Sequence, residues 1–195
     1  MTEFKSLKSV SHGDAVSLSS QARDPFNCDW HANALHVFDD FERHDPLLLR
    51  SNTSLDHAEQ LMNSAKVRYA CVVNSNEQIV GLVALREFHS RHAMQVSQST
   101  QLPWADLTVG DLMRKLDELP QVEYKQLQKA RIGDTAATLK SAGRDFLLVF
   151  EAGSIRGVVS SLRIAQVTGE SVNIYHSAST FAEIISAVNH SHLND

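Results

Sequence analysis

The chain has 195 residues, a formal net charge of −5 and a hydrophobic content of 43%. This length suits one domain, or two small domains that share a core, and the negative charge argues against a broad nucleic-acid-binding surface. No apolar run approaches the roughly 20 residues that span a bilayer, and the N-terminus lacks the continuous apolar core of a secretory signal, so we expect no membrane attachment. Cys28 and Cys71 are the only cysteines, which favours a reduced, cytoplasmic protein.

Residues 1–44 are predicted to form an N-terminal extension that packs on the main body, with a short strand or helical turn at 34–38. The first unit, residues 45–92, begins with a strand at 47–49. Thr53 and Asp56 then have the spacing of a capping box. The apolar residues that follow recur at helical spacing: Leu55, Ala58, Leu61, Met62 and Ala65. The unit continues with strands at 69–73 and 79–84, a turn at 74–77 and a short helix at 86–92.

Residues 93–107 are polar, which predicts a linker. The second unit, residues 108–169, opens with a helix capped by Thr108. Its other elements are expected in chain order: a strand at 119–122, a short helix at 123–130, a helix at 134–142, strands at 146–150 and 155–160, and a helix at 162–167. Gly143 and Gly169 stand where glycine commonly ends a helix. Residues 170–195 are expected to form a C-terminal extension with a helix that begins near Thr180.

The two units repeat one another. Gly81 and Gly157 each lie in a short apolar run that follows a second run across a polar turn. Their separation, 157 − 81 = 76, equals that of Arg68 and Arg144, 144 − 68 = 76. A repeated strand-turn-strand unit flanked by helices predicts an α/β (α+β) fold of two pseudo-symmetric halves. The seam between such halves is a natural cleft for a ligand.

Four segments carry a resemblance to a known family: residues 52–62, the hairpin at 72–83, Thr108-Val109-Gly110-Asp111-Leu112-Met113, and Gly157-Val158-Val159-Ser160-Ser161-Leu162. In this order they resemble a tandem pair of CBS (cystathionine beta-synthase) domains, a Bateman module of the stand-alone bacterial type, over about residues 45–169. The resemblance implies a pseudo-two-fold pair of β-α-β-β-α units and a regulatory role. It also implies an adenosine-type ligand, such as AMP, ADP, ATP or S-adenosylmethionine, in the cleft between the copies.

In the family that the chain resembles, a Ser or Thr hydroxyl contacts phosphate and an Asp three residues later accepts hydrogen bonds from ribose. The first unit has Ala84 and Glu87 at these positions, and the second has Ser160 and Arg163. The Glu87 carboxylate can still accept from ribose hydroxyls, whereas a guanidinium has no acceptor and suits phosphate instead. The two clefts are therefore expected to differ, and a ribose-specific ligand is expected to prefer the one with Glu87.

The candidate ligand-binding residues are Arg68, Tyr69, Arg86 and Glu87 for the first cleft, and Arg144, Ser160 and Arg163 for the second. Some of these positions, and the two glycines of the repeat, have an alternative interpretation. Arg68 and Arg144 can be solvated arginines at the start of a strand. Gly81 and Gly157 can serve close helix–strand packing rather than the approach of a ligand to the backbone.

Two hypotheses for the function follow. The first is a ligand-sensing regulatory module, and the second is a non-catalytic dimeric interaction scaffold that has lost nucleotide binding. The family resemblance predicts a homodimer with helices near 55–65 or 134–142 in the contact, and the second hypothesis includes a protein partner. The chain has no Gly-x-Ser-x-Gly, Walker A or Gly-x-Gly-x-x-Gly motif, so we expect no catalytic residue. Its ten histidines lack the spacing of a zinc ligand set, and no metal site is expected.

Overall fold

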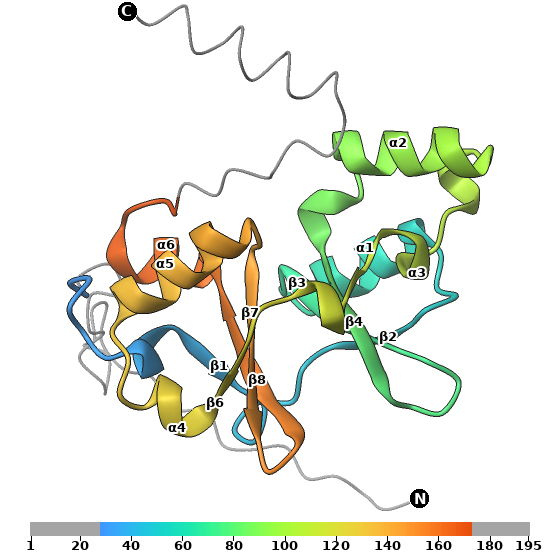
Figure 1. Ribbon diagram of the computed structural model, residues 1–195. Helices are drawn as coiled ribbons and strands as arrows, with labels where there is room; N and C mark the ends of the chain where they lie inside the picture. The colour runs from blue at the N-terminus through green and yellow to red at the C-terminus, as the bar shows by residue number, and fades with distance from the viewer. Residues whose placement is uncertain (1–27, 173–195) are drawn as a thin grey trace, which may run out of the picture.

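The computed structural model describes residues 28–172 of the chain, so the helix expected near Thr180 lies outside the described residues. The described residues contain two four-stranded sheets, which lie next to each other in Figure 1. The first sheet has the order β2-β3-β4-β5: β2 (Leu48–Arg50), β3 (Tyr69–Val73), β4 (Ile79–Ala84) and β5 (Arg114–Lys115). The second has the order β1-β8-β7-β6: β1 (Phe38–Asp40), β8 (Ser154–Ser160), β7 (Phe146–Glu151) and β6 (Gln121–Glu123). The mixed α/β fold expected from the sequence is confirmed.

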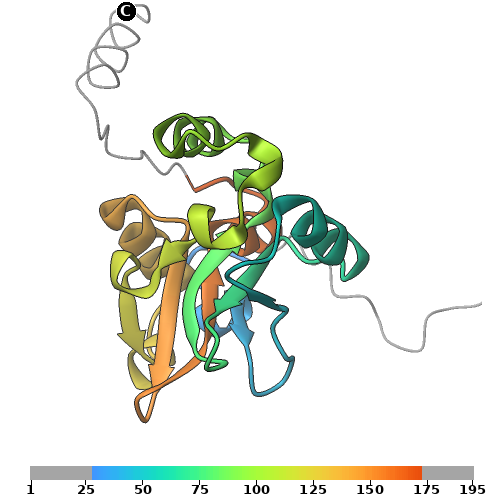
Figure 2. The ribbon, with the colours of Figure 1, turned by 90° about the vertical axis from the view of Figure 1, so that its right-hand side faces the viewer.

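Helices pack on the outer side of each sheet. The first unit has α1 (Leu55–Ser64), α2 (Arg91–Thr100) and α3 (Val109–Leu112), and the second has α4 (Tyr124–Leu127), α5 (Ile132–Ala142) and α6 (Ser161–Thr168). The helix capped by Thr108 was expected to open the second unit, but Val109 and Leu112 are buried in the core of the first. Single 3-10 turns are found at Ala34–Val37, Leu85–Glu87, Trp104–Asp106 and Leu116–Glu118. In both views α2 stands away from the sheets, at the top of the molecule (Figures 1 and 2). In agreement with this position, Ala93 is the only buried residue of α2.

Three apolar clusters hold the described residues together. One lies between α1, α3 and the outer face of the first sheet, and a second lies between α5, α6 and the outer face of the second sheet. The third joins the inner faces of the two sheets: Cys71, Leu82, Ala84, Leu119, Phe146, Leu148 and Val158. Burial of apolar surface is the main favourable term in folding, so this third cluster fixes the two units against each other and defines the clefts at their seam.

The repeat is confirmed, but the register of the two hairpins differs by one residue. Tyr69 pairs with Ala84 in the first hairpin, whereas Phe146 pairs with Ser160 in the second. The equivalent backbone hydrogen bonds run from Leu85 N to Arg68 O and from Ser161 N to Asp145 O. The offset is therefore 76 on the second strand of each hairpin (160 − 84) and 77 on the first (146 − 69). The equivalence of Arg68 with Arg144 is wrong, because the second hairpin is one residue shorter, and Arg68 corresponds to Asp145.

Residues 28–40 belong to the second unit. Strand β1 pairs antiparallel with β8, and Ala34 and Val37 are buried in the core of the second unit. Strand β5 pairs with β4 in the same way. Of the expected extension at 1–44, residues 28–44 are described by the structure, and within them residues 38–40 supply a strand of the second sheet, whereas residues 1–27 lie outside the described residues.

Three local expectations were wrong. Ser54 rather than Thr53 occupies the N-cap of α1, and its side chain makes no capping hydrogen bond. Most of the expected linker at 93–107 is helical, because α2 begins at Arg91 after Ser90, whose hydroxyl accepts from Ala93 N at 3.3 Å. The expected helix at 86–92 is instead a short 3-10 turn followed by the start of α2.

Candidate functional site

Two pseudo-symmetric clefts lie at the seam, and they differ greatly in size. The first, which we call the open cleft, is a cavity of about 490 Å³ between β1, the start of β3 and the β8–α6 junction. The second, the closed cleft, is lined by Ala84, Glu87, Arg114, Leu119 and Arg144 and holds only about 20 Å³. Small-molecule sites usually measure about 300–1,000 Å³, so only the open cleft has room for a nucleotide-sized ligand.

Basic side chains outnumber acidic ones in the open cleft. Its lining includes five basic residues: Arg43, His44, Lys66, Arg68 and Arg163. Three aspartates also line it, Asp39, Asp40 and Asp45. Within the part of the chain that the structure describes, the side chains of Lys66 and Arg68 form no ion pair or hydrogen bond, so both are available to an anion.

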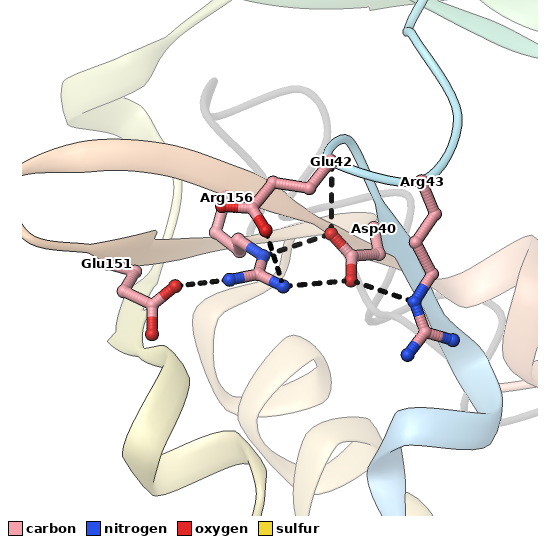
Figure 3. Close-up of polar contacts among 5 residues, drawn as sticks. All are labelled: Asp40, Glu42, Arg43, Glu151 and Arg156. Atoms are coloured by element: carbon pink, nitrogen blue, oxygen red, sulfur yellow. Dashed lines mark hydrogen bonds and ion pairs between the residues drawn. The ribbon is translucent and has the colours of Figure 1, made fainter.

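The Asp40 carboxylate is paired with Arg156. Its carboxylate accepts from Arg156 Nε at 3.0 Å and from the Arg156 Nη2 nitrogen at 3.2 Å, and Arg156 also contacts Glu42 and Glu151 (Figure 3). The hydrogen bonds from Arg156 are the main cause that lowers the pKa of Asp40. The Asp40 charge is therefore balanced by its neighbours, and the network ties β1 to β8 behind the cleft.

Asp39 is a second carboxylate in the lining of the open cleft. Tyr69 Oη donates to Asp39 Oδ2 at 3.1 Å, and Arg163 Nε lies 3.9 Å from Asp39 Oδ1. Burial is the main cause that raises the pKa of Asp39 and also that of Tyr69, so the phenol remains a donor. The sequence analysis missed Asp39, because its position depends on the pairing of β1 with β8, a contact between distant segments.

Ser160 can fill two roles at the N-terminus of α6. It is buried, and its Oγ accepts from Arg163 N at 3.1 Å as the N-cap of the helix. A hydroxyl that accepts one hydrogen bond can still donate its own proton. Ser160 can therefore donate to a ligand in the open cleft without loss of the helix cap.

The closed cleft is filled by its own side chains. Arg144 Nε donates to Glu118 O at 2.9 Å, and Ser90 Oγ donates to Glu87 O at 2.8 Å. Leu119, which is buried, occupies the position at which Pro46 lines the open cleft. The structure gives no support to the expected preference of a ribose for the cleft with Glu87, because the space there is only about 20 Å³.

The grouping of the candidate residues also changes. The sequence analysis assigned each cleft to one unit, whereas each cleft combines the start of the first hairpin strand of one unit with the end of the second hairpin strand of the other. Arg68 and Tyr69 join Ser160 and Arg163 in the open cleft. Glu87 and Arg144 line the closed cleft. Arg86 lines neither of the two clefts.

Arg86 belongs to a third cavity of about 330 Å³, which we call the axial cavity. Its lining consists of five pairs of equivalent residues: Arg68 and Asp145, Tyr69 and Phe146, Ala84 and Ser160, Leu85 and Ser161, and Arg86 and Leu162. The cavity therefore lies on the pseudo-two-fold axis. Arg86 forms an ion pair with Asp145, whose Oδ1 also accepts from Ser161 Oγ at 2.8 Å.

Two further searches gave negative results for residues 28–172. No group of three or more His, Cys, Asp or Glu side chains in this range could hold a metal ion. No helix in the same range has the length and apolar character needed to cross a membrane.

The model of the CBS domain family matches residues 38–91. This segment contains β1 to β4 and α1. The chain contains a CBS domain. Since the second unit repeats the hairpin and the following helix of the first, the two form a Bateman-type pair.

Solved structures with the same fold include an uncharacterized conserved protein from Pyrococcus horikoshii, with 17% identity and a TM-score of 0.53 over 76% of this chain and 100% of that chain. A CBS-domain containing protein from Agrobacterium tumefaciens has 14% identity and a TM-score of 0.50, over 72% and 98% of the two chains. A hemolysin-like protein containing a CBS domain from Oenococcus oeni PSU has the same identity and TM-score, over 72% and 93%. A search of curated proteins found no match.

Proposed function

We propose that this protein is a non-catalytic, cytoplasmic regulatory module that senses an anionic ligand, an adenine nucleotide or a related anion, in its open cleft. The observation that carries the proposal is the difference between the clefts. The open cleft is large and holds Lys66, Arg68 and Arg163 around its space, while the equivalent cleft is filled. A protein with a net charge of −5 needs such a local group of cations to bind an anion.

A ligand would be held by complementary groups. Lys66 and Arg68 at the start of β3 would face the phosphates, and Arg163 suits phosphate better than ribose. Ser160 would donate its hydroxyl proton to a phosphate oxygen. Asp39 has acceptor capacity beyond its bond from Tyr69 and could receive a hydroxyl or amine of the ligand.

A thermal-shift screen with AMP, ADP, ATP and S-adenosylmethionine tests the proposal. A ligand at one hundred times its Kd adds about 2.7 kcal/mol of stability, which raises the Tm of a protein of this size by about 5–10 °C. Arg68→Gln should remove the shift. Arg144→Gln is the control, because Arg144 lies one residue before the position equivalent to Arg68 and lines the closed cleft, and it should leave the shift intact. A shift that is lost in Arg144→Gln and kept in Arg68→Gln would refute the assignment.

The scaffold hypothesis has one observation in its favour, which is that the closed cleft has no space for a ligand. In that case the protein would act as a homodimer on a protein partner, with the dimer contact at α1 or α5. Leu61, whose side chain is 38% exposed on α1, would supply apolar surface there. The absence of any thermal shift, together with a dimer in light scattering at micromolar concentration, would favour this second function.

A further inference from the structure

The axial cavity differs in chemistry from the open cleft. Leu85, Phe146 and Leu162 line it together with Tyr69 and Ala84, and most of its surface is therefore apolar. Of its three charged residues, Arg86 and Asp145 contact each other, and the third, Arg68, also lines the open cleft. An anion in this cavity would compete with the Asp145 carboxylate for Arg86, whereas an apolar group would disturb no ion pair.

The two cavities adjoin each other and have four lining residues in common. Arg68, Tyr69, Ser160 and Leu162 line both of them. Tyr69 lies at the boundary between the two environments. Its ring lies 5.4 Å from the ring of Phe146 on the axial side, and its hydroxyl donates to Asp39 on the side of the open cleft. The basic side and the apolar side are thus separated by about the thickness of one side chain.

We propose that the open cleft and the axial cavity together form one bipartite site for an amphiphilic anion. The phosphate or other anionic group would lie beside Lys66 and Arg68, and an apolar or aromatic group would lie between Leu85, Phe146 and Leu162. The anionic half rests on the proposed function, and the apolar half goes beyond it. Volumes of about 490 and 330 Å³ both fall within the range of small-molecule sites.

The apolar half should contribute strongly to affinity. Burial of one methylene is worth roughly fourfold in a binding constant, so two buried methylenes should strengthen binding by more than about tenfold. A ligand that carries the anion alone would leave the axial cavity unused. The site should therefore discriminate between anions by their apolar part, and the charge alone should give weaker binding.

Calorimetry with octyl phosphate, inorganic phosphate and 1-octanol, below the micelle concentration, tests this inference. Octyl phosphate should bind at least tenfold more tightly than either of the other two. Leu162→Asn should weaken octyl phosphate about tenfold and leave inorganic phosphate unchanged. Leu102→Asn is the matched control, because Leu162 and Leu102 are 43% and 40% exposed, so neither change should unfold the protein. Lys66→Gln should weaken both phosphates.

The outcomes separate the two proposals. If ADP binds in a manner that depends on Lys66 but the octyl chain adds nothing, the bipartite site is wrong and the proposed function stands. If octanol binds as tightly as octyl phosphate, the cavity is apolar only and the bipartite site is again wrong. If neither ADP nor any phosphate binds, both proposals fail. The protein should also remain in the supernatant after sedimentation with phosphatidylglycerol vesicles, and pelleting that depends on Leu162 would indicate a bilayer lipid rather than a free molecule.

Discussion

The open and closed clefts are built by the same fold and differ in what fills them. Strand β1 crosses the open cleft and β5 crosses the closed one, at equivalent positions beside Gly157 and Gly81. Asp39 on β1 corresponds to Arg114 on β5, so the sign of the charge is reversed. The comparison teaches that the pseudo-symmetry of the backbone creates two potential sites, and that the side chains decide which one is open.

The largest difference between the two clefts is expected in the unfolding free energy when Gly157 or Gly81 is replaced by alanine. A Cβ on Gly157 would lie 2.2 Å from Asp39 O and 2.6 Å from the Phe38 ring, whereas a Cβ on Gly81 would lie 2.5 Å from Arg114 O. We expect Gly157→Ala to cost about 3 kcal/mol of unfolding free energy and Gly81→Ala about half of that, because β5 pairs over two residues and β1 over three, so β5 can shift more easily. Urea unfolding measures both.

The same pair of variants tests the role of β1 in the open cleft. Displacement of β1 should move Asp39, so Gly157→Ala should lose ligand binding even where it is folded. Gly81→Ala should keep it. Equal costs and equal binding in the two variants would contradict the distinction between the clefts.

The next effect is expected at the side chain that fills the closed cleft. Leu119 is 4% exposed, and Leu119→Ala should cost about 2–3 kcal/mol of unfolding free energy, since it removes a buried side chain and leaves a cavity. Leu47→Ala at the edge of the open cleft is the control and should cost less, because Leu47 is half-buried. Denaturant titration compares the two. A cost of Leu47→Ala that equals or exceeds that of Leu119→Ala would contradict the closed packing.

A third prediction concerns the equivalent positions Arg163 and Glu87. Arg163→Gln should weaken binding of ADP about tenfold, as expected for the loss of one hydrogen bond to a charged group. Glu87→Gln should leave the affinity unchanged, because Glu87 lines the closed cleft. Calorimetry gives both affinities. A loss of ADP affinity in Glu87→Gln but not in Arg163→Gln would support the ribose site that the sequence predicts at Glu87.

The smallest effect is expected in the pH dependence of the unfolding free energy, to which two adjacent aspartates on β1 contribute. The pKa of Asp40 is lowered by Arg156, so its stabilising contribution is present above the unfolded pKa and is lost as the pH falls through the folded pKa. The pKa of Asp39 is raised by burial, so its contribution is present at low pH and is lost as the pH rises through the folded pKa. Asp40→Asn should thus reduce stability at pH 7, and Asp39→Asn should preserve or increase it. Unfolding curves at pH 3 and pH 7 test the two signs.

Part of this structure could be predicted from the sequence. The hairpins followed from apolar runs around Gly81 and Gly157, and the end of α5 followed from Gly143, which adopts a φ of 60°. Both signals are local, because the chemistry of a turn or a cap is contained in a few neighbouring residues.

The site required information that the sequence pattern does not hold. A constant offset of 76 placed Arg68 opposite Arg144, and a single missing residue in the second hairpin turn moved the equivalence to Asp145. The pairing of β1 with β8 joins residues far apart in the chain, so Asp39 could not be placed at the cleft. Whether a cleft is open depends on packing, which no motif at Glu87 or Arg163 could reveal.

The most direct test of the central claim is the calorimetric stoichiometry of ADP binding to the wild-type chain. The account predicts one site per chain, located in the open cleft and lost in Arg68→Gln. A stoichiometry of two would show that the closed cleft also binds ligand, and binding at one site that persists in Arg68→Gln but disappears in Arg144→Gln would show that the wrong cleft was assigned.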